Sequence, residues 1–366
     1  MGKILVTGGS GFIGANFILY ARSQEMAEII NLDKLTYASN PKSLEQLQND
    51  TGYIFQQGDI GNSALVLSLL RQHQPQYVVN FAAESHVDRS IFSPQEFIQT
   101  NVVGTFQLLE AVRAFYQELL PDQKEHFRFL HISTDEVYGS LQAGEPAFSE
   151  NTPYAPNSPY AASKASSDHL VRAYHHTYGL PTLTINCSNN YGPRQFPEKL
   201  IPLMIFNAIN QKPLPIYGSG ANIRDWLYVE DHCRAISLVL LKGKVGDTYN
   251  IGGGNQPTNL ELVTQICTIL DEVLPRPNFS YQSLITFVKD RPGHDYRYCV
   301  NFSKIKQTLG WEPTETLDSG LRKTIRWYLD NLEWLKQCKS QNYDDWVVKN
   351  YGDTMGKSES HEVVQT

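Results

Sequence analysis

A group of four glycines near the start of the chain restricts the fold more than any other feature. Gly8, Gly9, Gly11 and Gly14 stand in TGGSGFIG, between the apolar run ILV and the helical pattern FIGANFILYARSQ. Glycines with this spacing allow a tight turn and let the phosphates of a ligand approach the backbone. The following helix would add N–H donors and the positive end of its dipole. The segment therefore predicts a strand, a turn and a helix that together bind a pyrophosphate.

Short apolar runs alternate with helical patterns over the first 135 residues. Strands are expected at KILVTGG, EIINLDK, QYVVNFAA and FRFLHIST, with a third strand in chain order before Asp59. Helices are expected at FIGANFILYARSQ, near 63–72 and from about 104 to 117. Strands separated by such helices form a parallel sheet that is covered on both faces. We therefore expect an α/β fold with a doubly wound, parallel, Rossmann-type sheet and a second, smaller α/β substrate-binding domain.

The pattern becomes less regular in the second half of the chain. Residues 139–158 are rich in Pro, Gly, Ser and Asn and should form a loop. Ser158 and Pro159 then open a helix that should end at Gly179. The segment WLYVEDHCRAISLVLL predicts a strand and a helix that return to the first domain. We expect that domain over 1–190 and about 226–250, a second one over 191–225 and 251–350, and a disordered tail at 352–366.

A carboxylate at the end of the second expected strand indicates which cofactor binds. Asp33 stands 19 residues after Gly14, where an acidic side chain accepts hydrogen bonds from a ribose diol and repels a 2′-phosphate. This favours NAD over NADP. Residues at the carboxyl ends of the other strands should face the same crevice. The expected cofactor contacts are Gly8, Gly11, Phe12, Ile13, Gly14, Asp33, Lys34, Thr36, Asp59, Ile60, Phe81, Ala82, Ala83, Ser85, Thr100, Tyr160 and Lys164.

A hydroxyl and two carboxylates end the fifth expected strand, at Thr134, Asp135 and Glu136. Tyr160 and Lys164 are four residues apart on the following helix, so their side chains share one face. An ammonium favours a nearby phenolate, and lowering a pKa by about three units needs roughly 4 kcal/mol. We expect Lys164 and a positively charged nicotinamide to lower the pKa of Tyr160. Tyr160 would then take a proton from a substrate hydroxyl that Thr134 holds.

Charge and composition exclude several classes of protein. The chain has 38 acidic and 31 basic residues, a net charge of −7, which argues against a surface for nucleic acid or anionic membranes. No apolar run approaches the roughly 20 residues of a membrane span, and none forms a signal-peptide core. The five cysteines are odd in number and contain no C-x-x-C pair, which is typical of a reducing compartment. We expect a cytoplasmic protein without a metal site.

Further segments carry a family resemblance, namely AAESHVDRS, STDEVYG, SPYAASKASSDHL, NCSNNYGP, FPEKLIP, LPIYG, IRDWLYVEDH, YNIGG and DRPGHD. With the glycine pattern and Y-x-x-x-K, they resemble the extended short-chain dehydrogenase/reductase family and, within it, the dTDP-glucose 4,6-dehydratases. The resemblance implies an NAD-dependent lyase that forms dTDP-4-keto-6-deoxyglucose and water by hydride transfer from carbon 4 to carbon 6. It implies that Glu136 removes the carbon-5 proton and that Asp135 protonates the departing hydroxyl.

The resemblance also implies a nucleotide-sugar site and a homodimer. The dimer would form through the helices at about 104–117 and 159–178, although helices that only cover the sheet are the alternative. Asn190 would lie beside the nicotinamide. Arg194 departs from some relatives, and its role stays open between a phosphate contact and a solvent-facing charge. The implied substrate contacts are Ser85, Thr134, Asn189, Glu198, Lys199, Leu200, Pro215, Tyr217, Arg224, Asn259, Arg291 and His294.

Two alternatives remain at this point. One is another nucleotide-sugar enzyme, either a 4,6-dehydratase for a different nucleotide or a 4-epimerase. An epimerase needs the tyrosine and the lysine but not the acid pair, so Asp135 and Glu136 count against it. The other is a non-catalytic NAD-binding sensor, and the presence of Thr134, Tyr160 and Lys164 together counts against that.

Overall fold

The computed structural model describes residues 2–291 and 293–338. The expected tail at 352–366 and the end of the expected second domain at 339–350 lie outside these residues. Within the described part of the chain, no helix combines the length and the apolar character that a bilayer span requires.

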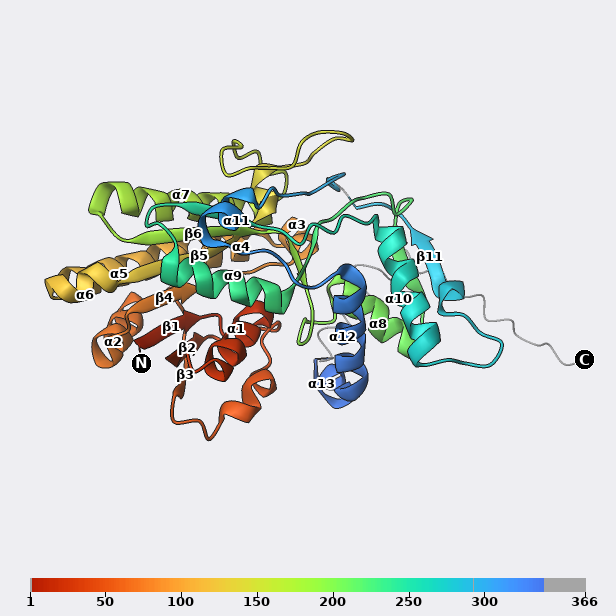
Figure 1. Cartoon of the computed structure of the whole chain (residues 1–366), viewed down its shortest axis with the longest axis horizontal. Coiled ribbons are helices and arrows are strands. Elements are labelled where there is room, and N and C mark those ends of the chain that lie inside the picture. The colour runs from red at the N-terminus through yellow and green to blue at the C-terminus, as the bar shows by residue number, and fades with distance from the viewer. Residues whose placement is uncertain (1, 292, 339–366) are drawn as a thin grey trace, which may run out of the picture.

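Seven strands form the central sheet, in the order β10-β6-β5-β4-β1-β2-β3. All neighbouring pairs run parallel, which confirms the expected doubly wound α/β fold (Figure 1). The order reverses beside β1, the strand that leads into the glycine-rich turn, and ligands of such sheets bind at that point. The strands are β1 Gly2–Thr7, β2 Ala27–Asp33, β3 Tyr53–Gln57, β4 Tyr77–Asn80, β5 Arg128–Thr134, β6 Thr182–Cys187 and β10 Thr248–Ile251.

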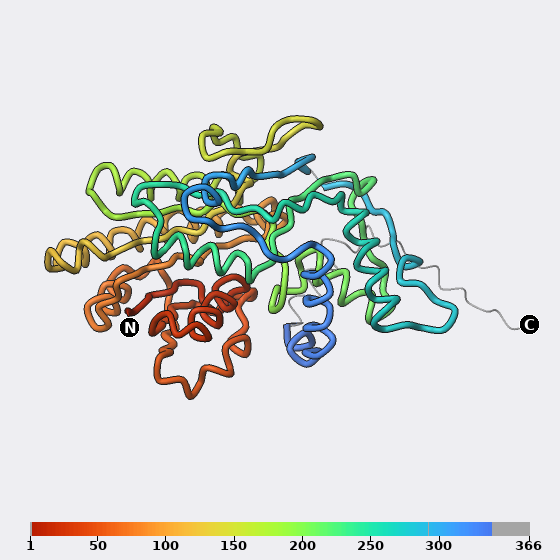
Figure 2. The backbone as a smooth tube through the Cα atoms, in the orientation of Figure 1, coloured from red at the N-terminus to blue at the C-terminus, as the bar shows by residue number. Residues whose placement is uncertain are grey.

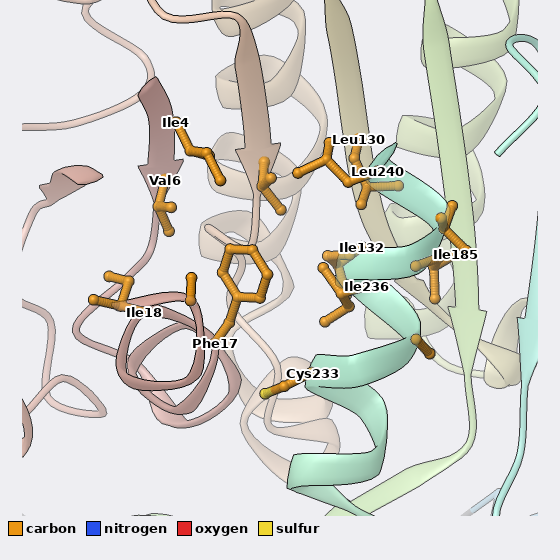
Figure 3. Packing of buried hydrophobic residues seen from close by; sticks show 14 of the residues in the cluster. Ile4, Val6, Phe17, Ile18, Leu130, Ile132, Ile185, Cys233, Ile236 and Leu240 are labelled. Carbon is orange, nitrogen blue, oxygen red and sulfur yellow. The ribbon is translucent and has the colours of Figure 1, made fainter. Parts of the chain in front are cut away.

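Helices cover both faces of this sheet because its strands are apolar on both sides. In β1, Ile4 and Val6 pack under α1 Phe12–Ser23, α9 Val229–Lys242 and α11 Ser303–Leu309. Leu5 points the other way, towards α2 Ser63–His73, α5 Thr105–Glu118 and α7 Pro159–Tyr178. Figure 3 shows the first of these two cores, in which Phe17 from α1 and Ile236 from α9 meet the strands.

The expected helix at 104–117 is part of a longer helical run. It is preceded without a break by α4 Pro94–Phe97 and by a π-helical turn at Ile98–Gly104. A short helix, α3 Val87–Phe92, comes before them, and α6 Pro121–His126 follows α5. The other expected helix is confirmed: the Ser158 hydroxyl accepts the Ala161 N–H at 3.1 Å, and Gly179 ends α7 with φ +69°.

A second apolar core lies beyond the carboxyl ends of the strands, at the right of Figure 2. It is built from α8 Leu200–Ile209, α10 Asn259–Val273, α12 Leu317–Asp330 and α13 Leu332–Gln337. β8 Leu214–Tyr217 and β11 Ile285–Val288 pair in parallel at its edge. The exact limits of the two expected domains stay a prediction.

The expectation of a strand returning to the first domain at residue 226 is wrong. β9 Trp226–Tyr228 pairs with β7 Asn189–Tyr191 in a separate two-stranded sheet. Only the helix of that segment, α9, returns to the central sheet, and the strand that completes the sheet is β10. β9 has only three residues. Pairing with β7 and pairing with the central sheet would bury the same apolar side chains, so the sequence does not distinguish between them.

Phe17 should be a strong determinant of stability, because its side chain is 0 % exposed between α1 and the sheet. We expect Phe17→Ala to lower the free energy of unfolding by about 3 to 5 kcal/mol, through lost transfer energy and the cavity left behind. Denaturant-induced unfolding measures this. Phe55→Ala on β3, where the side chain is 42 % exposed, is the control and should cost far less. Equal losses would contradict the packing described here.

Candidate functional site

The glycine-rich turn leaves an open backbone surface at the carboxyl end of β1. Gly8 has φ +71°, and a Cβ there would lie 2.6 Å from the backbone nitrogen of Ala82. A Cβ on Gly14 would lie 2.4 Å from the carbonyl oxygen of Gly8. At Gly11, by contrast, the nearest described atom that a Cβ would meet, chain neighbours apart, is the Gly8 carbonyl oxygen, 3.3 Å away. Gly11 is the N-cap of α1 and has no side chain to cap the first N–H groups of the helix, so the turn fits a ligand pyrophosphate.

Asp33 ends β2 beside this turn, and its carboxylate is held in place by three donors. Oδ2 accepts the Ser10 N–H at 2.9 Å, while Oδ1 accepts the Leu35 N–H at 2.8 Å and the Ser39 hydroxyl at 3.0 Å. Each carboxylate oxygen has two lone pairs, so Oδ2 retains acceptor capacity for a hydroxyl of a ligand. This fits a ribose diol.

All the residues expected to contact the cofactor line one cleft, together with Asn190. Whether each of them touches a ligand stays a prediction. The sequence analysis missed further wall residues, most of which are chain neighbours of the residues it named at strand ends. They are Leu32, Ala38, Ser39, Gly58, Glu84, Ile132, Ser133, Cys187, Ser188, Gln195 and Phe196.

The expected chemical residues gather at one end of this cleft. Thr134, Glu136, Tyr160 and Lys164 line it, brought together by β5 and by α7 packed against β5. Thr134 caps a short 3₁₀ turn, since its Oγ1 accepts the Glu136 N–H at 3.3 Å. Asp135 lies behind the wall, with Oδ1 3.4 Å from Thr134 Oγ1, and its buried Oδ2 has no hydrogen-bond partner among the described residues.

Our expectation of a lowered Tyr160 pKa depends on a bound nicotinamide and stays a prediction. Burial raises the pKa of its phenol well above the ordinary value, and Glu136 and Cys187 raise it further, opposed by a hydrogen bond with Thr134. The Lys164 ammonium donates instead to the Ile132 carbonyl oxygen at 2.8 Å. The Y-x-x-x-K motif predicts that Tyr160 and Lys164 lie close together. The free energy needed to bury a phenolate, however, depends on the surrounding fold.

The two neighbouring carboxyl groups have different surroundings. Burial, Glu136 and Asp225 all raise the pKa of Asp135 well above its ordinary value. Burial also raises the pKa of Glu136, but the cations of Arg291, Arg224 and Lys199 act in the opposite direction. Asp135 therefore favours its protonated form, while Glu136 is the better placed of the two to carry a negative charge.

A second cavity adjoins the cleft, and the two share Ser85, Glu136 and five other wall residues. Every expected substrate residue except Thr134 lines it, and Thr134 lines the cleft instead. Their individual roles stay a prediction. The sequence analysis missed part of its wall, including Asp88, Gln195 and Tyr298, which reach it from three different segments.

Three cationic side chains line this second cavity, those of Lys199, Arg224 and Arg291. Lys199 Nζ donates to the Ser85 carbonyl oxygen at 2.7 Å, and the Arg224 guanidinium donates to backbone carbonyl oxygens such as that of Asp295 at 3.0 Å. Arg291 Nη1 lies 3.3 Å from Asp88 Oδ1, and its buried Nε has no partner among the described residues. An unpartnered buried N–H favours an anionic ligand such as a diphosphate.

Tyr217 lines the second cavity from β8. Its hydroxyl donates to Asp88 Oδ2 at 3.4 Å, and its ring meets the His294 ring edge-on at 6.0 Å between centroids. Arg194 lines neither hollow. Its guanidinium carbon lies 5.3 Å from the centre of the Trp327 ring on α12, and the two roles left open for it stay predictions. No group of three or more potential metal ligands occurs in residues 2–291 and 293–338.

Comparisons with known proteins agree with this geometry. Residues 5–324 match the family model described as GDP-mannose 4,6 dehydratase. The chain is 54 % identical over 357 residues to the dTDP-glucose 4,6-dehydratase of Salmonella typhimurium, covering 95 % of this chain and 99 % of that one. It is 57 % identical over 345 residues to the enzyme of Xanthomonas campestris pv. campestris, with 94 % and 97 % covered.

A solved structure shows the same fold. The dTDP-glucose 4,6-dehydratase from Bacillus anthracis, determined in complex with NAD, has a TM-score of 0.82 and 47 % identity, covering 93 % of this chain and 100 % of that one. Both the sequence and the fold match over nearly the whole length. The chain therefore belongs to the family of dTDP-glucose 4,6-dehydratases.

Proposed function

We propose that the protein is a lyase that converts dTDP-glucose to dTDP-4-keto-6-deoxyglucose and water, with NAD as its cofactor. The observation that carries this proposal is the contrast between Asp135 and Glu136 beside Tyr160. The NAD-bound relative and the ribose and pyrophosphate positions at Asp33 and the glycine turn support the cofactor. When bound, NAD would accept a hydride from carbon 4 of the sugar and return it to carbon 6.

The residues of the cleft would move the protons of this reaction. Tyr160 takes the proton of the carbon-4 hydroxyl, which Thr134 orients through its own hydroxyl. The ketone formed at carbon 4 acidifies the proton on carbon 5, and Glu136 removes it as general base. Asp135 supplies the proton with which the carbon-6 hydroxyl leaves as water; its Oδ1 lies 3.4 Å from Thr134 Oγ1 on the cleft wall. Glu136 then returns its proton to carbon 5. The proton that Tyr160 took replaces the one that Asp135 gave up, through the Thr134 hydroxyl that contacts both, so that both groups are restored.

The second cavity would hold the nucleotide and its diphosphate. Lys199, Arg224 and Arg291 supply positive charge there, and guanidinium groups match phosphate oxygens in shape as well as charge. We further propose that the protein works in the cytoplasm. All five cysteines are free and buried, as is usual in a reducing compartment.

We also propose a homodimer formed through the expected helices at about 104–117 and 159–178, together with the helical run from α3 to α5 against which α7 packs. Large apolar side chains are exposed along this run at Phe92, Ile98, Val103 and Phe106. Apolar side chains gathered on one surface mark an interface, because leaving them in water forfeits their burial energy. A second copy of the same helices offers an equally apolar surface, as a two-fold interface requires.

The decisive experiment for the proposed reaction uses dTDP-glucose with deuterium at carbon 4. We expect NMR of the product to show deuterium at carbon 6 of a 4-keto-6-deoxy sugar, with no net consumption of NAD. Inversion at carbon 4 without loss of water would identify an epimerase. Turnover of UDP-, CDP- or GDP-glucose but not dTDP-glucose would overturn the assigned nucleotide. Failure with all of them would favour a non-catalytic NAD-binding protein. Glu136→Gln serves as the control, because it should allow the first hydride transfer and stop carbon-5 exchange.

Asp135→Asn tests whether Asp135 is protonated in the fold. A carboxyl whose pKa is raised on folding contributes stability that is lost as pH rises from its unfolded pKa towards its folded one. Asparagine does not titrate, so the variant should gain stability relative to the parent between pH 5 and 7, by at most about 1.4 kcal/mol per pH unit. Denaturant unfolding at both pH values measures this. The exposed Asp330→Asn is the control, and a constant difference for Asp135→Asn would contradict the assignment.

Phe106→Glu tests the dimer. Phe106 is 39 % exposed on α5, and a glutamate there would place a charge in the proposed interface. We expect sedimentation velocity to show the parent as a dimer and the variant as a monomer or a weaker dimer. Phe287→Glu on β11, where the side chain is 55 % exposed, is the matched control and should leave the parent's state unchanged. A monomeric parent would refute the proposal.

A further inference from the structure

Lys164 is buried in a site that holds its ammonium without a direct ion pair. Its Nζ donates to the Ile132 carbonyl oxygen at 2.8 Å and lies 3.4 Å from His131 Nε2. Within residues 2–291 and 293–338, no carboxylate oxygen lies within 4.0 Å of it. A buried ammonium with only these neighbours tends to lose its proton, since burial penalises the charged form. Its charge therefore needs support from further away.

The neighbouring imidazole of His131 is held from its other edge by Asn80. The Thr7 hydroxyl lies 2.6 Å from Asn80 Oδ1, and the amide of Asn80 faces His131 Nδ1 at 3.1 Å. Burial and Lys164 lower the pKa of His131 to about 4. The imidazole is therefore neutral near pH 7 and does not compete with Lys164 for positive charge.

Asp168 approaches the same ring nitrogen of His131 as Lys164 does. Its Oδ1 is 3.4 Å from His131 Nε2, while its Oδ2 accepts the Ser133 hydroxyl at 2.8 Å and the Tyr154 hydroxyl at 3.0 Å. Two hydroxyl donors therefore converge on Oδ2, while the buried Oδ1 has no hydrogen-bond partner among the described residues. Asp168 is buried and lines neither the cleft nor the second cavity. The mechanism proposed above gives it no task.

We propose that Asp168, which shares the Nε2 edge of the neutral His131 ring with Lys164, is the counter-charge that keeps Lys164 protonated next to Tyr160. This inference rests on the proposed function and adds two positioning residues to it. A carboxylate in direct contact would cancel much of the ammonium's field. A carboxylate that lies near the ammonium without touching it stabilises the ammonium against burial and leaves its field available to Tyr160, which shares its helix face.

The groups around Lys164 make Asp168 the main source of this support. From β5 come His131 and the Ile132 carbonyl, from α7 Asp168, and from β6 Cys187. Burial lowers the pKa of Lys164, while Asp168 and, after it, Cys187 raise it. The pKa of the Cys187 thiol is itself raised by burial to about 12, so it bears no charge near neutral pH.

The test is the pKa of Lys164 in the full-length protein, measured by NMR with ¹³C at the lysine ε-carbons. Lys164→Met assigns the signal. Asp168→Asn keeps the size of the side chain and an acceptor for Ser133 and Tyr154, so it should fold. We expect it to lower the pKa of Lys164 by about 1 to 2 units and to move the basic limb of the activity profile to lower pH by a similar amount. Tyr154→Phe removes one hydrogen bond to the same carboxylate but no charge, and should leave that limb in place.

An unchanged pKa of Lys164 in Asp168→Asn would overturn the inference, as would an equal shift in Tyr154→Phe. If Asp168→Asn does not fold, ¹⁵N NMR of the parent protein decides: the inference requires a neutral His131 ring at pH 7, and a charged ring would refute it. A lowered pKa of Lys164 in a protein that dehydrates no nucleotide sugar would overturn the proposed function and leave this inference standing.

Discussion

Burial of titratable groups at the carboxyl edge of the sheet is the constraint on which the rest of this structure depends. Asp135, Tyr160 and Lys164 are all buried, and burial is the largest cause of each of their pKa shifts. Such groups destabilise a fold unless packed elements hold their partners in place. The apolar cores on both faces of the sheet supply that rigidity, and β5 and α7 form part of them. The proton-transfer groups are therefore placed where helices and sheet pack most closely around them.

The same constraint explains why a second core is needed. A parallel sheet alone would leave the ends of β1, β4 and β5 open to water, and the pKa shifts would largely disappear. The second core covers these ends, and segments distant in sequence meet there, such as Arg291 and Asp88. The carboxyl group of Glu136 lines both the cleft and the second cavity.

The sequence was sufficient for local features whose physical cause is also local. The glycine turn, the Ser158 cap and the Gly179 end of α7 each depend on a few neighbouring residues, and the alternating strands follow from their apolar runs. Features that depend on distant segments could not be predicted in this way. The pairing of β9 with β7 and the packing of Arg194 on Trp327 are of this kind. So is the raised pKa of Tyr160, because desolvation is a property of the whole enclosure.

The contrast between Asp135 and Glu136 shows how distant charge can set the roles of adjacent residues. Nothing in two consecutive carboxyl side chains tells which will hold its proton. Asp135 faces the carboxyl group of Asp225, whereas Glu136 faces Arg291, Arg224 and Lys199 from the second cavity. A diphosphate bound among these cations would offset their charge and raise the pKa of Glu136, making it a stronger base. The arrangement therefore links the basicity of Glu136 to the presence of the nucleotide, so that proton removal is favoured when a substrate is in place.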